Sequence, residues 1–264
     1  MRNSFKTLCM IFVICFINAV GFTQEVAVAS EDAFKVNLTE EVSIFNLTND
    51  TITEVNTSLE FALSEKIQVS LSLPVYSSTN DPSSARELSW QLDNGTFGST
   101  GTGLGDLDVA FTWKNLATIL DDVWVDAVGG VKVPIDSTYS SDNFAFFGGV
   151  DFGFTRDKVD FSQSLKYYLV DKYTYMPHLG GFVDSNVFAG KTTAMLDVGN
   201  KLSVGVVVDE FFSDGQKTVS VGPVVEYAVS SNLNLHAGVG FAVVDDLQYD
   251  SLDSVITVGL GFKF

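Results

Sequence analysis

The chain has 264 residues, 46% of them apolar, with 33 acidic residues against 15 basic ones. So acidic a chain is repelled by nucleic acids and by anionic membrane surfaces, which argues against both as partners. Its mean hydropathy is nevertheless positive. A soluble protein would hide that apolar surplus in a core, whereas a membrane barrel spreads it along lipid-facing alternate positions.

The first residues have the layout of a secretory signal peptide. Arg2 and Lys6 are basic, and the apolar run 8–17 is followed by two small-residue patterns that suit cleavage. This run is too short for a transmembrane helix, which needs about 17–25 apolar residues. We therefore expect a signal peptide at residues 1–29, cleaved between about 21 and 29, and a single domain at residues 30–264.

Apolar and polar residues alternate from residue 34 to the end of the chain. In the segment 52–63, for example, the odd positions from Val55 to Leu63 are mostly apolar, whereas the even positions from Glu54 to Glu60 are polar. Strict alternation over eight or more residues predicts a β-strand. No segment of comparable length repeats with a helical period, so the chain is predicted to be all-β.

Twelve segments of about 10–13 residues carry this pattern: 34–45, 52–63, 66–76, 104–114, 122–134, 144–155, 158–169, 187–198, 201–210, 217–229, 232–243 and 253–264. This is the length that a tilted strand needs to cross a bilayer, and about twice the average in soluble proteins. Short turns alternate with six connections that are mostly longer: 46–51, 77–103, 135–143, 170–186, 211–216 and 244–252.

Short periplasmic turns, longer outer loops and an even number of strands are typical of outer-membrane barrels. We therefore predict an antiparallel transmembrane β-barrel of twelve strands, with both ends of the mature chain on the periplasmic side. The alternative is a soluble β-sandwich or a lipocalin-like barrel, which also shows alternation. Its strands would be about half as long.

Two motifs resemble the outer-membrane protein family of the meta-pathway of phenol degradation. Residues 71–76 read Leu-Ser-Leu-Pro-Val-Tyr, and residues 103–108 read Gly-Leu-Gly-Asp-Leu-Asp. The family has a similar strand ending in Leu-Pro-Tyr, then Gly-x-Gly-Asp-Leu at the start of the next strand. This chain departs from it at Val75, which intrudes between Pro74 and Tyr76. The resemblance implies passage of small aromatic or other apolar molecules.

The last segment also resembles a known signal. It alternates apolar residues and ends on Phe262 and Phe264, similar to the C-terminal signal that the barrel assembly machinery of Gram-negative bacteria reads. The resemblance implies this machinery and outer-membrane lipid as partners.

The alternation also places charged side chains on the inner face of the barrel. Asp106 and Asp108 stand two apart near the outer end of one strand, so both point inward. The other carboxylates expected there are Glu54, Glu60, Asp126, Asp151, Asp160, Asp197, Asp209, Glu226 and Asp253, and the lysines are Lys35, Lys114, Lys132, Lys166 and Lys263. Eleven carboxylates against five lysines leave an excess of about six (11 − 5), which predicts a preference for cations or neutral solutes. The structural alternative is a network of paired charges that fills the interior.

Metal binding and catalysis have weak signals. Cys9 and Cys15 lie in the expected signal peptide, which leaves the mature chain without thiols or disulfides. His178, in a loop, and His236, on the inner face, are too few for a metal site. No serine stands two residues from His236, although Ser220 on an adjacent strand could approach it. We therefore expect no metal, no cofactor and no enzymatic activity.

Aromatic residues gather at the end of one strand and in the connection after it: Tyr167, Tyr168, Tyr173, Tyr175 and Phe182. The favoured interpretation is an aromatic girdle at the membrane interface. Alternatively, these residues line the outer mouth along the path of a solute.

These patterns favour a passive outer-membrane channel or uptake barrel for small solutes, with aromatic or hydrophobic compounds among them. The alternative is a plugged structural barrel that presents its outer loops to partners, and an outer-membrane enzyme is the third hypothesis. Twelve strands leave a lumen that side chains and an infolded loop can fill. The sequence therefore allows both an open pore and a plugged barrel.

Overall fold

The computed structural model describes residues 35–48, 50–79, 102–120, 122–135, 139–141, 143–170, 174–179, 181–183, 185–247 and 251–264. The signal peptide expected at residues 1–29 lies outside them. Within these ranges, no helix is long and apolar enough to cross a membrane.

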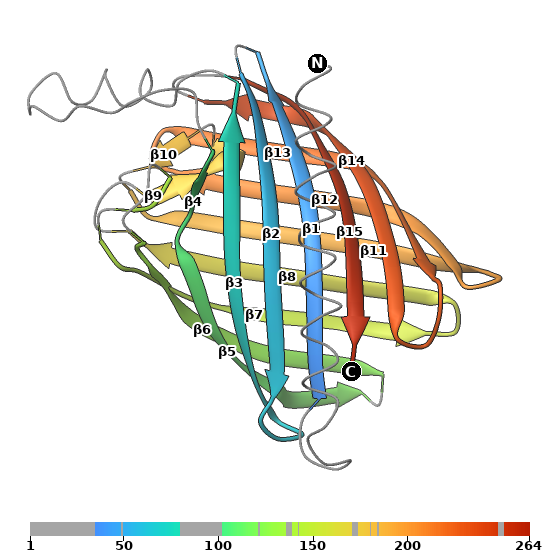
Figure 1. The fold of residues 1–264 in the computed structure, drawn as a ribbon. Coiled ribbons are helices and arrows are strands. Elements are labelled where there is room, and N and C mark those ends of the chain that lie inside the picture. The colour runs from blue at the N-terminus through green and yellow to red at the C-terminus, as the bar shows by residue number, and fades with distance from the viewer. Residues whose placement is uncertain are drawn as a thin grey trace, which may run out of the picture.

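One closed antiparallel sheet forms the wall of the molecule (Figure 1). Its strands are β1 (Lys35–Leu47), β2 (Thr51–Ala62), β3 (Ile67–Ser78), β4 (Thr102–Leu104), β5 (Leu107–Leu120), β6 (Val123–Val133), β7 (Ala145–Arg156), β8 (Val159–Leu169), β11 (Val187–Gly199), β12 (Leu202–Ser213), β13 (Gln216–Ala228), β14 (Leu233–Asp246) and β15 (Leu252–Lys263). Because β4 and β5 both pair with β3 in succession, they make one wall strand. The barrel therefore has twelve strands (13 − 1).

The first and last wall strands close the barrel. β1 pairs with β15 from Asn37 opposite Lys263 to Leu47 opposite Leu252, and β2 pairs with β3. We call the end where β1 begins and β15 ends the turn end, because its connections are short, and the opposite end the loop end. All twelve predicted segments are confirmed as wall strands.

The wall strand that contains β5 extends beyond its predicted end at residue 114. Asn115 adopts a left-handed backbone conformation, with φ of 54°, and its amide donates to Asp126 Oδ1 at 2.7 Å. This bulge interrupts the ladder between Trp113 and Ala117, after which pairing with β6 resumes. The alternation is lost at the bulge, which is why the sequence pattern predicts that the strand ends at residue 114.

The outer face of the wall is apolar. Phe111, Trp113 and Phe146 stand on it and are 56%, 56% and 58% exposed. A soluble protein rarely leaves large apolar patches uncovered, whereas the lipid of a bilayer covers them. The wall strands, of 11–14 residues apart from β4, are long enough to cross the hydrocarbon layer. The chain is therefore an outer-membrane barrel.

The inner face carries small and polar side chains. Ser72 of β3 donates to Asn56 Oδ1 of β2 at 2.6 Å, and the hydroxyls of Ser43 and Thr257 are 3.1 Å apart between β1 and β15. Inner polar groups thus find partners on neighbouring strands, as buried or half-buried polar groups generally do.

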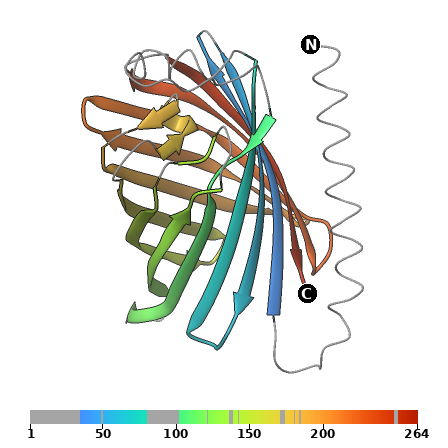
Figure 2. The ribbon, with the colours of Figure 1, turned by 60° about the vertical axis from the view of Figure 1, so that its left-hand side comes forward.

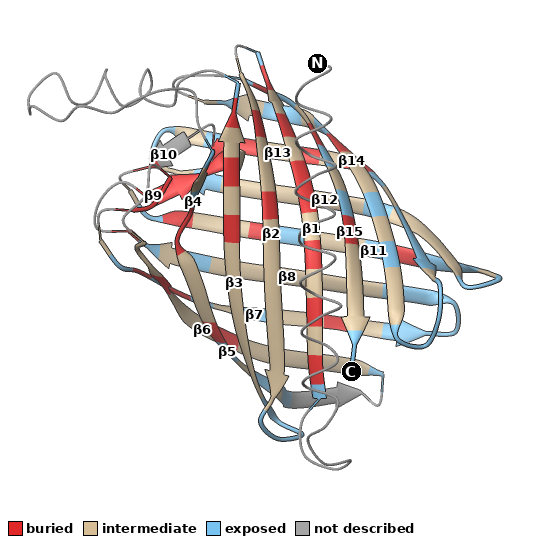
Figure 3. Ribbon diagram, viewed as in Figure 1, coloured by how far each residue is buried: buried red, intermediate tan, exposed pale blue. Residues whose placement is uncertain are grey.

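A short segment between β8 and β11 folds across the loop end. It comprises β9 (Thr174–Met176), the 3-10 helix η1 (Pro177–Leu179) and β10 (Gly181–Val183), and β9 pairs with β10. We call these three elements the plug; they lie over the mouth of the barrel, coloured yellow in Figure 2. β9 is wholly buried, whereas the turns at the opposite end are exposed (Figure 3). The sequence pattern predicts only a connection at 170–186, because three-residue strands are too short to show alternation.

We expect the folded protein to run anomalously on an unboiled detergent gel and to shift after boiling. A closed wall has no free strand edge from which detergent can separate the strands. Circular dichroism of the unboiled sample should show strand. Identical mobility before and after boiling, together with a helical spectrum, would contradict the barrel.

Candidate functional site: the lumen and its plug

Three tyrosines join the plug to one side of the wall. Tyr76 of β3, Tyr139 of the connection after β6 and Tyr175 of the plug pack with ring centroids 4.7, 5.0 and 5.5 Å apart. They are only 5%, 0% and 5% exposed. Aromatic pairs at such distances contribute about 0.5–1.5 kcal/mol each beyond their burial, so this cluster stabilises the plug in the mouth.

The plug also contacts the other side of the wall. The ring of His178 stacks on Phe211 of β12 at 4.0 Å and meets Phe45 of β1 edge-on at 4.7 Å. Thr218 of β13 donates to the His178 carbonyl at 2.9 Å. Since β1 lies four strands away from β12 around the wall, after β13, β14 and β15, these contacts place η1 inside the barrel.

Burial keeps the imidazole of His178 neutral. Desolvation, together with the nearby Lys191 ammonium, lowers the pKa of His178 to about 3. The ring is therefore uncharged at neutral pH, and it contributes an aromatic face to the plug rather than a positive charge.

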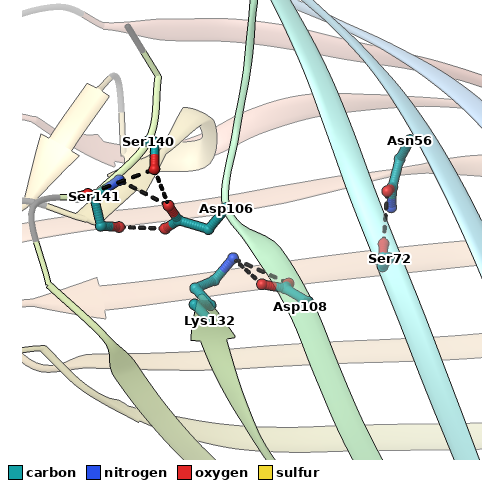
Figure 4. Close-up of polar contacts among 7 residues, drawn as sticks. All are labelled: Asn56, Ser72, Asp106, Asp108, Lys132, Ser140 and Ser141. Atoms are coloured by element: carbon teal, nitrogen blue, oxygen red, sulfur yellow. Dashed lines mark hydrogen bonds and ion pairs between the residues drawn. The ribbon is translucent and has the colours of Figure 1, made fainter. Parts of the chain in front are cut away.

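Asp106 holds a loop at the mouth. Its carboxylate accepts hydrogen bonds from the Ser140 hydroxyl at 2.8 Å, from the Ser141 amide at 2.7 Å and from the Ser141 hydroxyl (Figure 4). Asp106 is 4% exposed. The residue before it, Gly105, lies where the wall strand is interrupted between β4 and β5. A side chain at this position would collide with the ring of Tyr76, so glycine is required there. Residues 103–108 thus position a loop, and the Asp106 carboxylate is occupied by hydrogen bonds from Ser140 and Ser141.

Asp108, two residues further on, forms an ion pair across the wall. It stands opposite Lys132 of β6, whose Nζ lies 2.9 and 3.0 Å from its two carboxylate oxygens (Figure 4). Bidentate contact between a lysine and a carboxylate is strongest where water is scarce, and the Lys132 side chain is only 10% exposed. The two charges offset each other.

Glu41 of β1 is an inner carboxylate that the sequence analysis did not select. Its Oε2 lies 2.9 Å from Nε2 of His236 on β14. Gly259 of the intervening β15 stands opposite both residues, and any side chain there would collide with the imidazole. The Glu41 and His236 side chains remain 32% and 24% exposed. Ser220 forms no hydrogen bond with His236 among the residues that the structure describes.

Lys191 of β11 is a further inner charge that is not among those expected from the sequence. It stands opposite Ser164 of β8 and Asp209 of β12, and its side chain is exposed. It forms no ion pair within the described ranges, but it interacts electrostatically with Asp209 and with Glu41. Alternation could have found both residues, because Glu41 stands six positions after Lys35 and Lys191 six before Asp197.

Several predicted inner charges have a polar partner nearby. Glu60 accepts a hydrogen bond from Asn37 at 3.1 Å, and Asp160 accepts one from Thr155 at 3.2 Å. The register places most of the remaining ones on the inner face by the same alternation: Glu54, Asp126, Asp151, Asp197, Asp209, Glu226, Lys35, Lys166 and Lys263. Lys114 and Asp253 stand at irregularities of the ladder, where the register assigns neither of them to a face.

The inner wall keeps its acidic excess. Glu41 and Asp245, which stands opposite Thr218 on the inner face, add two carboxylates, and Lys191 adds one lysine, so that carboxylates still outnumber lysines there. Within the part of the chain that the structure describes, no group of three or more histidine, aspartate or glutamate side chains could hold a metal ion. The charges are spread around the wall instead.

The predicted aromatic cluster is divided between two faces. Tyr167 is 47% exposed on the lipid side, as a girdle requires. Tyr168 packs inside against a phenylalanine of β7 at 5.2 Å, and Tyr175 belongs to the plug. Tyr173 and the side chain of Phe182 lie outside the described part of the chain. The girdle interpretation thus suits Tyr167, and the outer-mouth interpretation suits Tyr168 and Tyr175.

Solved structures of outer-membrane porins and channels share the fold of this chain. No family model matches the chain, and no curated protein matches its sequence. Among solved structures, the NanC porin has a TM-score of 0.57 at 10% identity, with 86% of this chain and 100% of that one covered. An outer-membrane channel from Pseudomonas putida F1 has a TM-score of 0.55 at 12% identity, with 88% and 95% covered. The KdgM porin has 0.51 at 8%, with 86% and 99% covered.

Replacing Asp106 with Ala should loosen the loop at Ser140 and Ser141 without opening the wall. A buried hydrogen-bonding group left without its partner costs about 1–3 kcal/mol. We expect the Ser141 amide to exchange its hydrogen faster in the Asp106→Ala protein. Asp108→Asn is the control and should leave that exchange unchanged. Equal protection of Ser141 in wild type and Asp106→Ala would show that the loop does not depend on this carboxylate.

Proposed function

We propose that this barrel is a passive outer-membrane channel for small solutes, narrowed at its loop end by the plug. One observation carries the proposal: inner charges below the plug are reached by solvent, among them the exposed Lys191 and the half-exposed pair of Glu41 and His236. A lumen packed solid would leave unpaired inner charges without water, at a large cost in free energy. The fold that the chain shares with porins and channels supports the same conclusion.

The proposal includes an orientation and a route of assembly. The loop end faces outward and the turn end faces the periplasm, in line with the usual plan of these barrels. Residues 1–29 serve as the signal peptide, and residues 30–264 are the mature chain. Phe262 and Phe264, which stack at 6.3 Å on the last strand, are the residues through which the barrel assembly machinery recognises it.

The solutes that we propose include aromatic and other apolar molecules. The mouth is built from aromatic side chains, namely Phe45, Tyr76, Tyr139, Tyr175 and Phe211. A solute with an apolar body can replace one of these contacts by stacking at little cost, whereas a strongly hydrated ion cannot. The motifs at 71–76 and 103–108 support the same class.

The tight burial of the plug favours one alternative, a structural barrel closed at its mouth. Thr174, Tyr175 and Leu179 are at most 5% exposed, which is the burial of a protein core. Removing the plug distinguishes the two functions, because a plug that only narrows a channel leaves some transport in its presence.

Deleting residues 174–183 and joining the flanks with a short Gly-Ser linker should raise solute entry. In a liposome-swelling assay, wild type should admit a small neutral sugar slowly and the deletion should admit it faster, because the plug is the element that crosses the lumen. The unboiled gel verifies that the deletion still folds. If wild type admits nothing and only the deletion conducts, the barrel is closed and the channel proposal is wrong.

The acidic inner wall should make the channel prefer cations. Exchanging both Glu60 and Glu226 for Gln should reduce the cation preference, measured as the reversal potential across a salt gradient. The effect should grow at low salt, where screening lengths reach roughly 30 Å. Glu40 of β1 is a matched control, because it points to the outer face and accepts a hydrogen bond from Thr57 there. An unchanged potential in the double variant, or an equal change in Glu40→Gln, would contradict the assignment of faces.

A further inference from the structure

The lumen below the plug has a positive group that no carboxylate neutralises by direct contact. Lys191 is exposed on the inner face and forms no ion pair with any residue that the structure describes. Lys166 stands one step away on β8, since Lys191 is opposite Ser164 and Lys166 is opposite Ala189. Such diagonal neighbours on one face of a sheet are about 7–8 Å apart. Lys191 is therefore the exposed member of a basic pair.

The opposite side of the lumen is acidic. Glu41 of β1 stands opposite Asn56 of β2, and Glu54 of β2 stands opposite Ser43, so the two glutamates are diagonal neighbours on the inner face. Around the wall, β8 is six strands from β1 and β11 is six strands from β2, since the order is β1, β2, β3, β5, β6, β7, β8, β11. In a barrel of twelve strands, six positions is the far side. The basic pair and the acidic pair therefore lie on opposite walls.

The two walls are close enough to act together. The ring of His178 in the plug contacts Phe45 of β1 and Phe211 of β12, so the two walls are bridged there. Glu41 precedes Phe45 by four residues on the same face of β1, and Lys191 stands opposite Asp209, two residues before Phe211 on β12. Both side chains therefore lie below η1, on the two sides of the space beneath it, and they form no ion pair with each other. His236 contacts Oε2 of Glu41, and this carboxylate forms no other hydrogen bond within the described residues.

A solute of single charge does not suit this arrangement. An anion near Lys191 would also feel the acidic excess of the lumen, and a cation near Glu41 would feel the basic pair. A molecule with both charges satisfies both walls, because its carboxylate can lie at Lys191 while its ammonium lies at Glu41. Charge-assisted hydrogen bonds at both ends would fix its orientation across the lumen.

From this geometry we propose that the lumen contains a site for small zwitterions of amino-acid size, with Lys191 as the carboxylate pole and Glu41 as the ammonium pole. The inference rests on the proposed function, since the solute must enter the lumen, and it adds a polar solute class to the apolar molecules proposed above. The plug above the site delays each solute between the two poles.

Four probes of matched size test the site. Alanine is a zwitterion at neutral pH, lactate an anion, alaninamide a cation and lactamide uncharged. We would measure uptake of each labelled probe, at low concentration, into liposomes that contain the full-length barrel. Wild type should admit alanine faster than lactamide, lactate or alaninamide.

Substitution of each pole should abolish the uptake of a different pair of probes. Relative to lactamide, Lys191→Gln should lose the uptake of alanine and lactate, and Glu41→Gln should lose the uptake of alanine and alaninamide. Lys158→Gln, in the turn between β7 and β8, and Glu40→Gln, on the outer face, are controls that should keep the wild-type order. All variants are checked for folding by the unboiled gel.

Two results overturn the site. In the first, alanine enters wild type no faster than lactamide. In the second, the variants leave the uptake of alanine unchanged and alter only that of lactate and alaninamide, as the changed net charge of the lumen alone would do. In both cases lactamide still enters, so the channel stands and only the site is lost. If none of the four probes enters wild type, the proposed function fails as well.

Discussion

The structure depends on one constraint, that no backbone amide or carbonyl can stay unpaired in the hydrocarbon of a bilayer. The wall meets it by closing, with β1 against β15 and β2 against β3. Closure fixes the register, and a slip of one residue would turn every inner side chain to the lipid. The faces of Glu40 and Glu41, which are adjacent in the chain and point in opposite directions, follow directly from that register.

Charges on the inner face then determine what the lumen can hold. The Lys132 side chain is largely shielded from solvent, and it and Asp108 neutralise each other at 2.9 Å. Lys191 lacks such a partner and keeps its contact with solvent. Paired charges such as Lys132 and Asp108 make the wall rigid, whereas solvent-exposed charges such as Lys191 provide sites for solutes. The plug adds the third element, a roof of aromatic rings that narrows the path above these charges.

The wall could be predicted from the sequence because alternation is a local signal. All twelve strands and the acidic inner face follow from it, and Glu41 and Lys191 were within its reach. The plug could not be predicted, because its contacts join Tyr175 to Tyr76 and His178 to Phe45, 99 and 133 residues away in the chain, and have no period. The same holds for Asp106, whose partners Ser140 and Ser141 lie in a separate connection. Its expected share in selectivity stays a prediction, although its carboxylate is engaged by the loop.

Single-channel recording of the wild-type barrel in a planar bilayer tests the central claim most directly. A narrowed channel with a wet, acidic lumen should give discrete current steps in potassium chloride. Replacing potassium with a larger organic cation should reduce those steps, because the plug limits the size of what passes. A heat-modifiable, folded preparation that inserts into the bilayer and gives no current above the detergent background would show that the plug closes the lumen, and the barrel would then not be a channel.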